Sequence, residues 1–498
     1  MQIPSPVMFV LEALRTAGYE AYAVGGCVRD FALSREPKDW DVATSAKPDD
    51  IQKIFSKSFY ENKFGTVTVL KDSMEIQVTT YRIDNRYSDK RHPDSVKYTS
   101  DLKEDLTRRD FTMNAMALDA VSAGDTEGDF KSRQQHRGTL LKPSSVSPRI
   151  IDPFNGQQDL RDKLIRAVGD PKERFGEDAL RLMRAARFAA QLDFLIEENT
   201  LRALKELAPT IKFVSHERIR DELVKIIMSV RAGKGIDLLR ETGLLAVFLP
   251  EVMEGYGVGQ NKHHIYDVYE HNMRALQYAA EQGFNLETRL ASLFHDVAKP
   301  RVKVGDGPNS TFYNHDLVGA KMTRQIMQRM KFSLSEIEKT SLLVRYHLFY
   351  YNVDEVTPSS VRRLIKNVGL ENMDDLINVR FADRIGSGVP KAEPYKLRHF
   401  RYMVDKVSKD PISVKMLKIN GDDVMKILGI PPGPKVGILL QALFSEVLDD
   451  PSKNEENELK KRTMELDKFS ASELSEMIRK AEERVKTLED EEKRQYRV

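Results

Sequence analysis

The sequence predicts an α+β fold, with short strands and helices in the N-terminal part and helices alone in the rest. An apolar extended run at residues 20–24 leads into the glycine pair Gly25-Gly26, and a second extended run carries Asp39 and Asp41. From residue 178 onward, apolar residues recur at spacings of three and four with charged residues opposite them, which is typical of amphipathic helices. At 498 residues the chain is too long for one core, so we expect about three or four domains.

Composition favours a protein of a reducing compartment. The only cysteine, Cys27, excludes an internal disulfide framework. The first residues lack a basic stretch and a long apolar run, and no later segment is long and apolar enough to span a bilayer. We therefore expect a cytoplasmic protein with no membrane partner. The net charge of +2 is a weak signal for nucleic acid, so the local distribution of charge matters more.

The acidic pair and the glycine pair together indicate nucleotide chemistry. Asp39 and Asp41 are separated by one residue in an extended run, so their side chains point to the same side and can hold a divalent metal ion. The upstream glycines leave room for close approach and offer backbone N–H groups to a phosphate. A solvated strand end and a tight turn are the alternatives for either motif alone. Together they predict a small βαβ-like domain.

This pattern resembles the catalytic head of the class II tRNA nucleotidyltransferases, the CCA-adding enzymes, which share a family with bacterial poly(A) polymerases. The resemblance implies a polymerase-beta-like head with a mixed sheet, in which Asp39 and Asp41 are catalytic and bind Mg²⁺. Residues 64–69 and 74–82 look like the next two strands of the family's palm. The resemblance also places three upstream residues at the nucleotide: Gly25, Gly26 and Arg29.

Residues 108–117, Arg-Arg-Asp-Phe-Thr-Met-Asn-Ala-Met-Ala, are similar to the family's arginine-rich nucleotide-binding motif. The resemblance implies that Arg109 meets the triphosphate and that Asp110 accepts a hydrogen bond from a ribose hydroxyl, which favours ribonucleotides. It assigns Asn114 to the same site. Residues 151–156 resemble the hinge between head and neck, and Asp152 in this hinge joins the expected nucleotide-binding residues.

A Glu-Asp-x-x-Arg motif follows at residues 177–181. On a helix, Asp178 and Arg181 are three residues apart and share a face. A carboxylate accepts and a guanidinium donates, so the two can imitate the edge of a base and select a nucleotide without a template. The family is understood to select CTP and ATP in this way. An ordinary ion pair within a helix is the alternative. Arg184 and Arg187 complete the nucleotide site that the resemblance implies.

The implied reaction is a phosphoryl-type transfer, in which two metal ions bridge the nucleotide phosphates and the two carboxylates. A tRNA 3′ hydroxyl attacks, and pyrophosphate leaves. The chain departs from the family in one strand, where relatives usually carry a glutamate and this sequence has Gln77. If a third carboxylate assists the attack, it comes from Glu75 or Asp84, or it is absent.

Two polar segments separate the head's motifs. Residues 83–96 are turn-rich and short of hydrophobic anchors, so we expect a mobile loop. In this family such a loop is associated with switching from C to A addition, which favours full CCA synthesis over a poly(A) polymerase or an A-adding enzyme. Residues 120–149 resemble a disordered insertion, which we interpret as a tolerated surface loop.

A second candidate centre lies in the helical part. Six residues of metal-ligand type follow the order of the HD phosphohydrolase fold: His271, His295, Asp296, His315, His347 and Asp383. Imidazole with carboxylate suits Ni²⁺, Mn²⁺, Fe²⁺, Co²⁺ or Mg²⁺ better than structural zinc, for which thiolates are expected. The adjacent His295 and Asp296 can bridge a dinuclear centre. Some CCA-adding enzymes carry this domain and show phosphatase or 2′,3′-cyclic phosphodiesterase activity, so the resemblance implies a role in healing RNA 3′ ends.

We therefore predict a head at residues 1–156 with the insertion at 120–149, a helical neck at 157–250, an HD domain at 251–400 and a helical tail at 401–498. Basic residues crowd the neck and form a candidate surface for RNA phosphates. Residues 217–223 resemble the family's last motif, in which Glu217 or Glu222 would hold Arg181 or a neighbour. The expected partners are CTP, ATP and the acceptor arm and 3′ end of tRNA, bound by neck and tail. A phosphohydrolase with an inactive head and an RNA-binding scaffold are alternatives of other classes.

Overall fold

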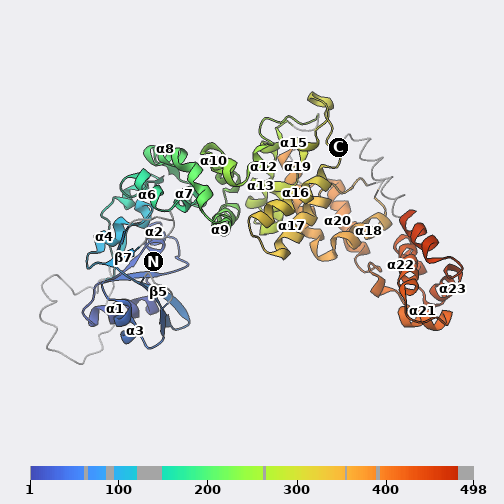
Figure 1. Ribbon diagram of the computed structural model, residues 1–498, viewed down its shortest axis with the longest axis horizontal. Helices are drawn as coiled ribbons and strands as arrows, with labels where there is room; N and C mark the ends of the chain where they lie inside the picture. The colour runs from blue at the N-terminus through green and yellow to red at the C-terminus, as the bar shows by residue number, and fades with distance from the viewer. Residues whose placement is uncertain are drawn as a thin grey trace. The chain divides into compact units, whose positions relative to one another are not determined.

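The computed structural model describes residues 2–60, 65–85, 95–120, 148–261, 265–353, 356–388 and 393–480. The chain folds into two compact units (Figure 1). Unit 1 comprises Met1–Ile226 and Asp237–Phe248, and unit 2 comprises Ile227–Ile236 and Leu249–Val498. Head and neck thus share unit 1, and the finer division into four domains stays a prediction. No helix in the described ranges is long and apolar enough to cross a membrane.

Unit 1 is built on a seven-stranded mixed sheet, as expected for an α+β head. The strand order is β3-β4-β5-β2-β1-β8-β9. Strands β2 and β5 are parallel, and the other neighbours are antiparallel. The strands are β1 Ala21–Val24, β2 Asp41–Thr44, β3 Ser58–Tyr60, β4 Thr66–Lys71, β5 Met74–Thr80, β8 Ala117–Asp119 and β9 Arg149–Ile151.

The βαβ-like expectation for the first two strands is wrong. Strand β1 is followed by α2 (Gly26–Ala32), but β2 returns antiparallel to β1. The alternation of apolar residues is the same for both strand directions, so the sequence pattern does not distinguish them. The observed register places Val24 opposite Asp41. The glycine turn that follows β1 therefore begins beside the first acidic residue of β2.

Two helices cover the apolar side of this sheet. Helix α1 (Ser5–Thr16) and helix α3 (Pro48–Ile54) pack against each other and against the strands, as Figure 1 shows. Their buried side chains are Val7, Val10, Leu11, Leu14 and Ile51. On the opposite face, α4 (Leu102–Thr107) packs against the strands through Leu102 and Leu106. The short helix η1 (Thr112–Asn114) follows it and contacts α5 (Gly156–Arg161).

The two ends of the polar segment at residues 83–96 lie in strands. The predicted strand at 74–82 ends at Thr80, and the chain enters a separate hairpin of β6 (Arg82–Asn85) and β7 (Ser95–Tyr98). The two strands pair antiparallel from Arg82 opposite Tyr98 to Asn85 opposite Ser95. Residues 86–94 of the expected mobile loop at 83–96 lie outside the described residues, as do residues 121–147 of the insertion predicted at 120–149.

The predicted helical neck is present, with one short parallel pair of strands added to it, β10 (Leu164–Ile165) and β11 (Leu195–Ile196). The helix expected from residue 178 begins at Leu180, because the Asp178 carboxylate accepts a hydrogen bond from the Leu180 N–H (3.0 Å). The helices are α6 Pro171–Glu177, α7 Leu180–Leu192, α8 Glu198–Leu207, η3 Ala208–Phe213, α9 His216–Ile227, α10 Ala232–Glu241 and α11 Leu244–Phe248.

The described residues of unit 2 form helices joined by loops, with one isolated antiparallel bridge between Val304 and Thr311. Helix α13 packs on α14 and α19, and α16 packs on α17, while α21, α22 and α23 bury a core of their own. The helices are α12 Pro250–Met253, α13 Val268–Glu281, α14 Leu286–Phe294, α15 Lys299–Val302, η4 Gly307–Asn309, α16 His315–Arg329, α17 Leu334–Tyr346, α18 Pro358–Val368, η5 Leu370–Asn372, α19 Met373–Gly386, α20 Tyr395–Val407, η6 Val414–Met416, α21 Gly421–Leu428, α22 Pro434–Asp449, η7 Pro451–Lys453 and α23 Glu456–Leu466.

We expect a Gly156→Ala substitution to destabilise unit 1. A Cβ at this position would lie 2.3 Å from the Thr112 carbonyl oxygen, a backbone atom in η1 that cannot move aside without disturbing the turn. The free energy of unfolding, measured by urea titration, should fall by about 1–3 kcal/mol. Gly176→Ala on α6 is the matched control, because its added Cβ meets nothing within 4 Å, and it should be neutral or slightly stabilising. Equal losses in both variants would contradict this contact.

Candidate active site

One face of unit 1 holds a cavity of about 590 Å³ between the sheet and α7. It collects nearly all the residues that the sequence assigned to the catalytic pair and the nucleotide. Five further lining residues were missed. Arg108, Leu180 and Arg218 lie within quoted motifs, whereas Phe188 and Gln191 lie further along α7. The described lining consists of Gly25, Gly26, Arg29, Asp39, Asp41, Arg108, Arg109, Asp110, Asn114, Asp178, Leu180, Arg181, Arg184, Arg187, Phe188, Gln191 and Arg218.

Asp152 is the predicted nucleotide-binding residue that does not line this cavity. Its carboxylate accepts hydrogen bonds from the N–H groups of Gly156 and Gln157, both at 2.8 Å. These bonds satisfy donors at the start of α5 that have no partner within the helix. Asp152 therefore positions the hinge next to the site rather than contacting the cavity.

The glycine turn forms one wall of the cavity. Gly25 has φ 82°, a conformation that side chains other than glycine rarely adopt. A Cβ at this position would lie 2.9 Å from the Arg109 guanidinium and 3.8 Å from the Asp41 carboxylate. The missing side chain thus lets an arginine and a catalytic acid candidate approach the same stretch of backbone.

Asp39 and Asp41 both face the cavity, as the alternation of strand side chains predicts. Asp39 precedes β2, and Asp41 is its first residue. Burial raises the pKa of Asp41, the nearby Arg109 opposes this effect, and the charge of Asp39 raises the pKa further. A buried carboxylate such as Asp41, with a second carboxylate beside it, fits a divalent cation, which would relieve both the burial and the repulsion.

The structure assigns no third carboxylate to this pair among the described lining residues. Gln77 on β5 lies in register with Asp41 and so on the same face of the sheet, but neither Gln77 nor Glu75 lines the cavity. The side chain of Asp84 lies outside the described residues. The cavity's other two acids, Asp110 and Asp178, are engaged by arginines.

Asp110 is buried at the centre of the cavity wall. Its carboxylate accepts hydrogen bonds from Arg184 (2.6 Å) and Asn114 (3.1 Å). Burial by itself raises the pKa of Asp110, but the charge of Arg184 and the bond from Asn114 outweigh it and hold the pKa at about 2. The carboxylate is therefore ionised at neutral pH and links the head to α7.

Asp178 and Arg181 lie together in the cavity, but not as neighbours on one helix. Asp178 precedes α7 and pairs with Arg218 of α9 at 2.9 Å. Arg181 donates to the carbonyl oxygens of Arg174 (2.8 Å) and Arg108 (3.0 Å) and pairs with Glu177. The Asp178 carboxylate and the Arg181 guanidinium are thus each fixed by other residues. This favours the interpretation that they read a base over the alternative that they form an ion pair with each other.

The expected role of Glu217 or Glu222 is corrected in part. The acid that holds Arg181 is Glu177, the first residue of its own motif. Glu222 instead pairs with Arg187 at 3.1 Å, so it does hold a neighbouring residue of α7. Arg218, from the same segment, is one of the five lining residues that sequence reasoning missed.

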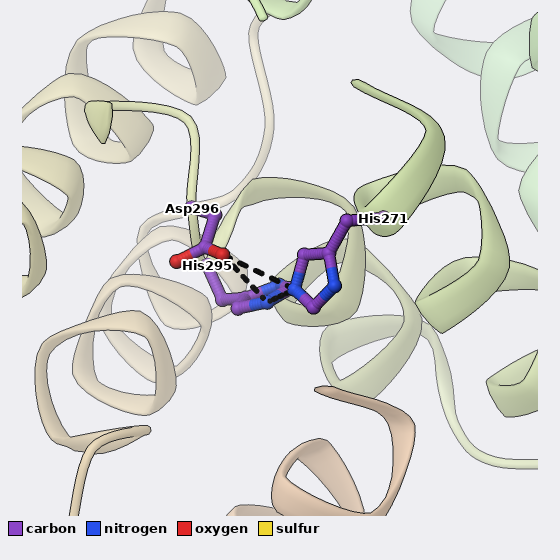
Figure 2. A group of neighbouring side chains, drawn as sticks. All are labelled: His271, His295 and Asp296. Atoms are coloured by element: carbon purple, nitrogen blue, oxygen red, sulfur yellow. Dashed lines mark hydrogen bonds and ion pairs between the residues drawn. The ribbon is translucent and has the colours of Figure 1, made fainter. Parts of the chain in front are cut away.

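In unit 2, the six predicted metal-ligand residues come together and are all buried. His271 lies in α13, His295 and Asp296 follow α14, His315 opens α16, His347 follows α17, and Asp383 lies in α19. They include two overlapping groups: His271, His295 and Asp296, drawn in Figure 2, and Asp296, His315 and His347. Asp296 belongs to both groups, as a carboxylate that bridges two ions would.

Distances within the first group are those of a shared ligand sphere. The Nε2 atoms of His271 and His295 are 2.8 Å apart and point toward each other (Figure 2). The Asp296 Oδ2 lies 3.1 Å and the Asp383 Oδ1 lies 3.3 Å from the His271 Nε2. In the second group, the Asp296 Oδ1 lies 3.4 Å from His315 Nε2 and 3.7 Å from His347 Nε2.

Three of the histidines are oriented by the backbone. The Nδ1 atoms of His295, His315 and His347 donate to the carbonyl oxygens of Ser292, Phe312 and Val344 at 2.6–2.9 Å. This arrangement directs each Nε2 lone pair into the centre, as in metal sites with ordered outer shells. Within the described residues, His315 Nε2 and His347 Nε2 have no hydrogen-bond partner.

The electrostatics of this centre also fit a metal ion. Burial lowers the pKa of His315 to about 3, so its imidazole is neutral and able to bind metal at pH 7. Burial raises the pKa of Asp296, but the charge of Lys299 and a hydrogen bond from His271 outweigh it and hold that pKa well below its usual range, so the carboxylate is ionised. Burial lowers the pKa of His271, but hydrogen bonds to Asp296 and Asp383 outweigh it and raise that pKa to about 9, so this imidazole would lose a proton when a metal ion binds. Imidazoles with carboxylates are ligands for a divalent transition-metal ion or Mg²⁺.

The Asp110 ion pair predicts a pH-dependent contribution to stability. Because the folded pKa of about 2 lies below the ordinary value of 3.8, the contribution is full above pH 3.8 and is lost as the pH falls toward 2. Urea unfolding of the wild type and Asp110→Asn should therefore show a gap that narrows by about 2 kcal/mol between pH 6 and pH 2, at ~1.36 kcal/mol per pKa unit. A gap that stays constant between pH 6 and pH 3 would contradict the ion pair.

Three family models match successive parts of the chain. Residues 21–166 match the poly A polymerase head domain. Residues 193–255 match the probable RNA and SrmB- binding site of polymerase A, and residues 268–385 match the HD domain. The matches cover the sheet and cavity, the helical neck and the metal-ligand cluster, in that order.

The chain is also similar to known proteins over nearly its full length. It is 32% identical over 456 residues to a CCA-adding enzyme of Geobacillus stearothermophilus, covering 90% of this chain and 94% of that protein. It is 34% identical over 365 residues to an A-adding tRNA nucleotidyltransferase of Deinococcus radiodurans, covering 70% and 76%. The crystal structure of Bacillus stearothermophilus CCA-adding enzyme in complex with CTP aligns with a TM-score of 0.67 at 28% identity, covering 94% and 98%.

The similarities agree with the site, since the acidic pair, the arginine-rich motif and the Glu-Asp-x-x-Arg motif meet in one cavity. Their extent goes beyond any single domain of the protein. The chain is a nucleotidyltransferase that belongs to the CCA-adding enzyme family.

Proposed function

We propose that the protein adds CMP, CMP and AMP to the 3′ end of tRNA, using CTP and ATP and no template. The observation that carries this proposal is the pair of polar edges, Asp178 and Arg181, facing the same cavity as Asp39 and Asp41. Base selection and bond formation would then occur in one site.

The donor and acceptor pattern of these edges matches cytosine and adenine. Both bases present an amino group beside an unprotonated ring nitrogen, which a carboxylate and a guanidinium satisfy by accepting and donating, respectively. Guanine and uracil present a carbonyl beside a ring N–H, so a carboxylate and a guanidinium would oppose the wrong groups. Arg218 and Glu177 hold the two side chains at fixed places, which makes the selection a property of the folded protein.

The remaining residues have roles that follow from their positions. Asp39 and Asp41 would hold Mg²⁺, which supplies charge for the triphosphate and lowers the pKa of the attacking 3′ hydroxyl. Arg109, beside the glycine turn and Asp41, would meet the triphosphate. Asp110 is ionised and accepts a hydrogen bond from Arg184. It would therefore either accept a hydrogen bond from a ribose hydroxyl or orient Arg184 toward the nucleotide.

We assign a role to each of the four domains that the sequence predicts. We assign catalysis to the head at residues 1–156, nucleotide selection and RNA contact to the neck at 157–250, and binding of the tRNA to neck and tail, with the tail at 401–498. The HD domain at 251–400 forms the second centre. We place the protein in the cytoplasm, in keeping with its single, buried cysteine.

The addition reaction can be tested with a tRNA that lacks its CCA end. We expect growth by three nucleotides with CTP and ATP together, and by two with CTP alone. Asp41→Asn should lower the rate by about 10²-fold or more, since it removes one of two ligands for the catalytic cation. Asp49→Asn, an exposed acid on α3, is the matched control and should add normally.

Other products would identify other members of the family. Long tails from ATP alone would mean a poly(A) polymerase. Extension only of a tRNA that already ends in CC would mean an A-adding enzyme, the activity named for the Deinococcus radiodurans relative. Undiminished addition by Asp41→Asn would overturn the proposed mechanism.

We also propose a phosphohydrolase activity on RNA 3′ ends for the HD domain. It rests on the two groups of ligands that share Asp296. Such a centre would hold Ni²⁺, Mn²⁺, Fe²⁺ or Co²⁺ and supply an activated water near a phosphate. Lys299 lies 2.6 Å from Asp296, close enough to offer a positive charge to the same phosphate.

This second activity is tested with an RNA that ends in a 2′,3′-cyclic phosphate, in Ni²⁺ or Mn²⁺. We expect the wild type to open the ring and Asp296→Asn to lose both turnover and bound metal, the latter measured after dialysis. Asp316→Asn is the matched control: this buried acid pairs with Arg345 and belongs to neither ligand group, so its metal content should be normal. An unchanged substrate with metal-loaded wild type would make the domain structural.

A further inference from the structure

A phenylalanine at the nucleotide cavity is surrounded by three arginines. The guanidinium carbons of Arg187, Arg29 and Arg184 lie 4.2, 5.2 and 5.4 Å from the centre of the Phe188 ring. Arg184 and Arg187 belong to α7, as Phe188 does, whereas Arg29 comes from α2 beside the sheet. All four residues line the cavity.

The ring itself is held in a fixed place. Phe188 is 4% exposed, and its neighbour Phe111 is fully buried. The two rings meet edge to face, with centroids 5.7 Å apart and planes at 86°. This is a favoured geometry for aromatic pairs, so the core of unit 1 determines where the Phe188 ring presents its faces.

Gathering three guanidinium groups in a partly buried wall is unfavourable without compensation. Each has an acidic partner, since Arg29 pairs with Asp30 (2.8 Å), Arg184 with Asp110 (2.6 Å) and Arg187 with Glu222 (3.1 Å). Even so, burial and then the charge of Arg184 lower the pKa of Arg187 to about 10. The negative face of an aromatic ring attracts guanidinium groups and offsets part of this repulsion.

We propose that Phe188 is a positioning residue for the polyphosphate of the incoming nucleotide. It holds Arg29, Arg184 and Arg187 side by side in the free protein, so that they meet the phosphates without first overcoming their mutual repulsion. The described lining of the cavity carries seven arginines and four aspartates, an excess that suits a triphosphate. The proposal rests on the proposed nucleotidyl transfer and adds to it the residue that organises its anion site.

The test separates phosphate binding from nucleoside binding. Phe188→Leu keeps an apolar side chain but removes the ring. We expect the KM for CTP and for ATP to rise about tenfold with kcat changed less than threefold, because the loss falls on binding of the phosphates. Calorimetry should show the same weakening for magnesium pyrophosphate and no change for CMP. Phe188→Tyr, which keeps the ring faces, should restore pyrophosphate binding.

A matched control distinguishes this role from packing. Phe175 on α6 is buried to the same degree, but it does not line the cavity. Phe175→Leu should therefore lower stability and leave pyrophosphate binding intact. Should Phe188→Leu not fold, Phe188→Met, whose unbranched and flexible side chain adapts to the space left by the ring, takes its place.

Two results would overturn the proposal: normal pyrophosphate binding by the ring-less variant, or equal weakening for pyrophosphate and CMP. Neither depends on tRNA extension, because binding is measured without tRNA. Failure of the wild type to extend tRNA would instead reject the proposed function, so the two failures are distinguishable.

Discussion

The pairing of buried arginines with acids is the constraint on which the nucleotide site depends. Every arginine of the described cavity lining has an acidic partner, and these partners come from the sheet side, from α6 and from α9. In a partly buried wall, a guanidinium without an anion would carry a large desolvation cost. The pairs that avoid this cost also connect the head to the neck within unit 1. The salt bridges that compensate the buried charges therefore also set the shape of the site.

The same constraint divides the four aspartates of the cavity into two kinds. Asp110 and Asp178 are neutralised by Arg184 and Arg218, and they fix those arginines in return. Asp39 and Asp41 instead lie close enough that the charge of one raises the pKa of the other. A site that pairs some acids with arginines and places two others together leaves the second pair as the place where a divalent cation is most favourable.

The metal-ligand cluster of unit 2 obeys a related rule. Three of its histidines, His295, His315 and His347, are tied through Nδ1 to backbone carbonyls, so their Nε2 atoms converge on Asp296. Two of these carbonyls, those of Ser292 and Val344, belong to the last turns of α14 and α17, which leave carbonyls without intrahelical partners. The third, that of Phe312, lies just before α16. The backbone at or near helix ends thus orients these ligands.

The sequence by itself determined the α+β class, and it identified most of the residues that the structure brings together, because these depend on residue type and local spacing. They are the proposed catalytic pair Asp39 and Asp41, most of the proposed nucleotide-binding residues and the six proposed metal ligands. Tertiary structure decided the rest. Strand direction between β1 and β2 depends on pairing partners, since alternation is the same either way. The partners of Asp178, Arg181 and Arg187, and the place of Phe188 among three arginines, depend on packing between distant segments. Asp152 resembles a ligand in sequence, yet two nearby N–H groups take up its carboxylate. The sequence shows which chemical groups are available. The folded structure decides which of these groups meet, because buried charges must find partners from distant segments.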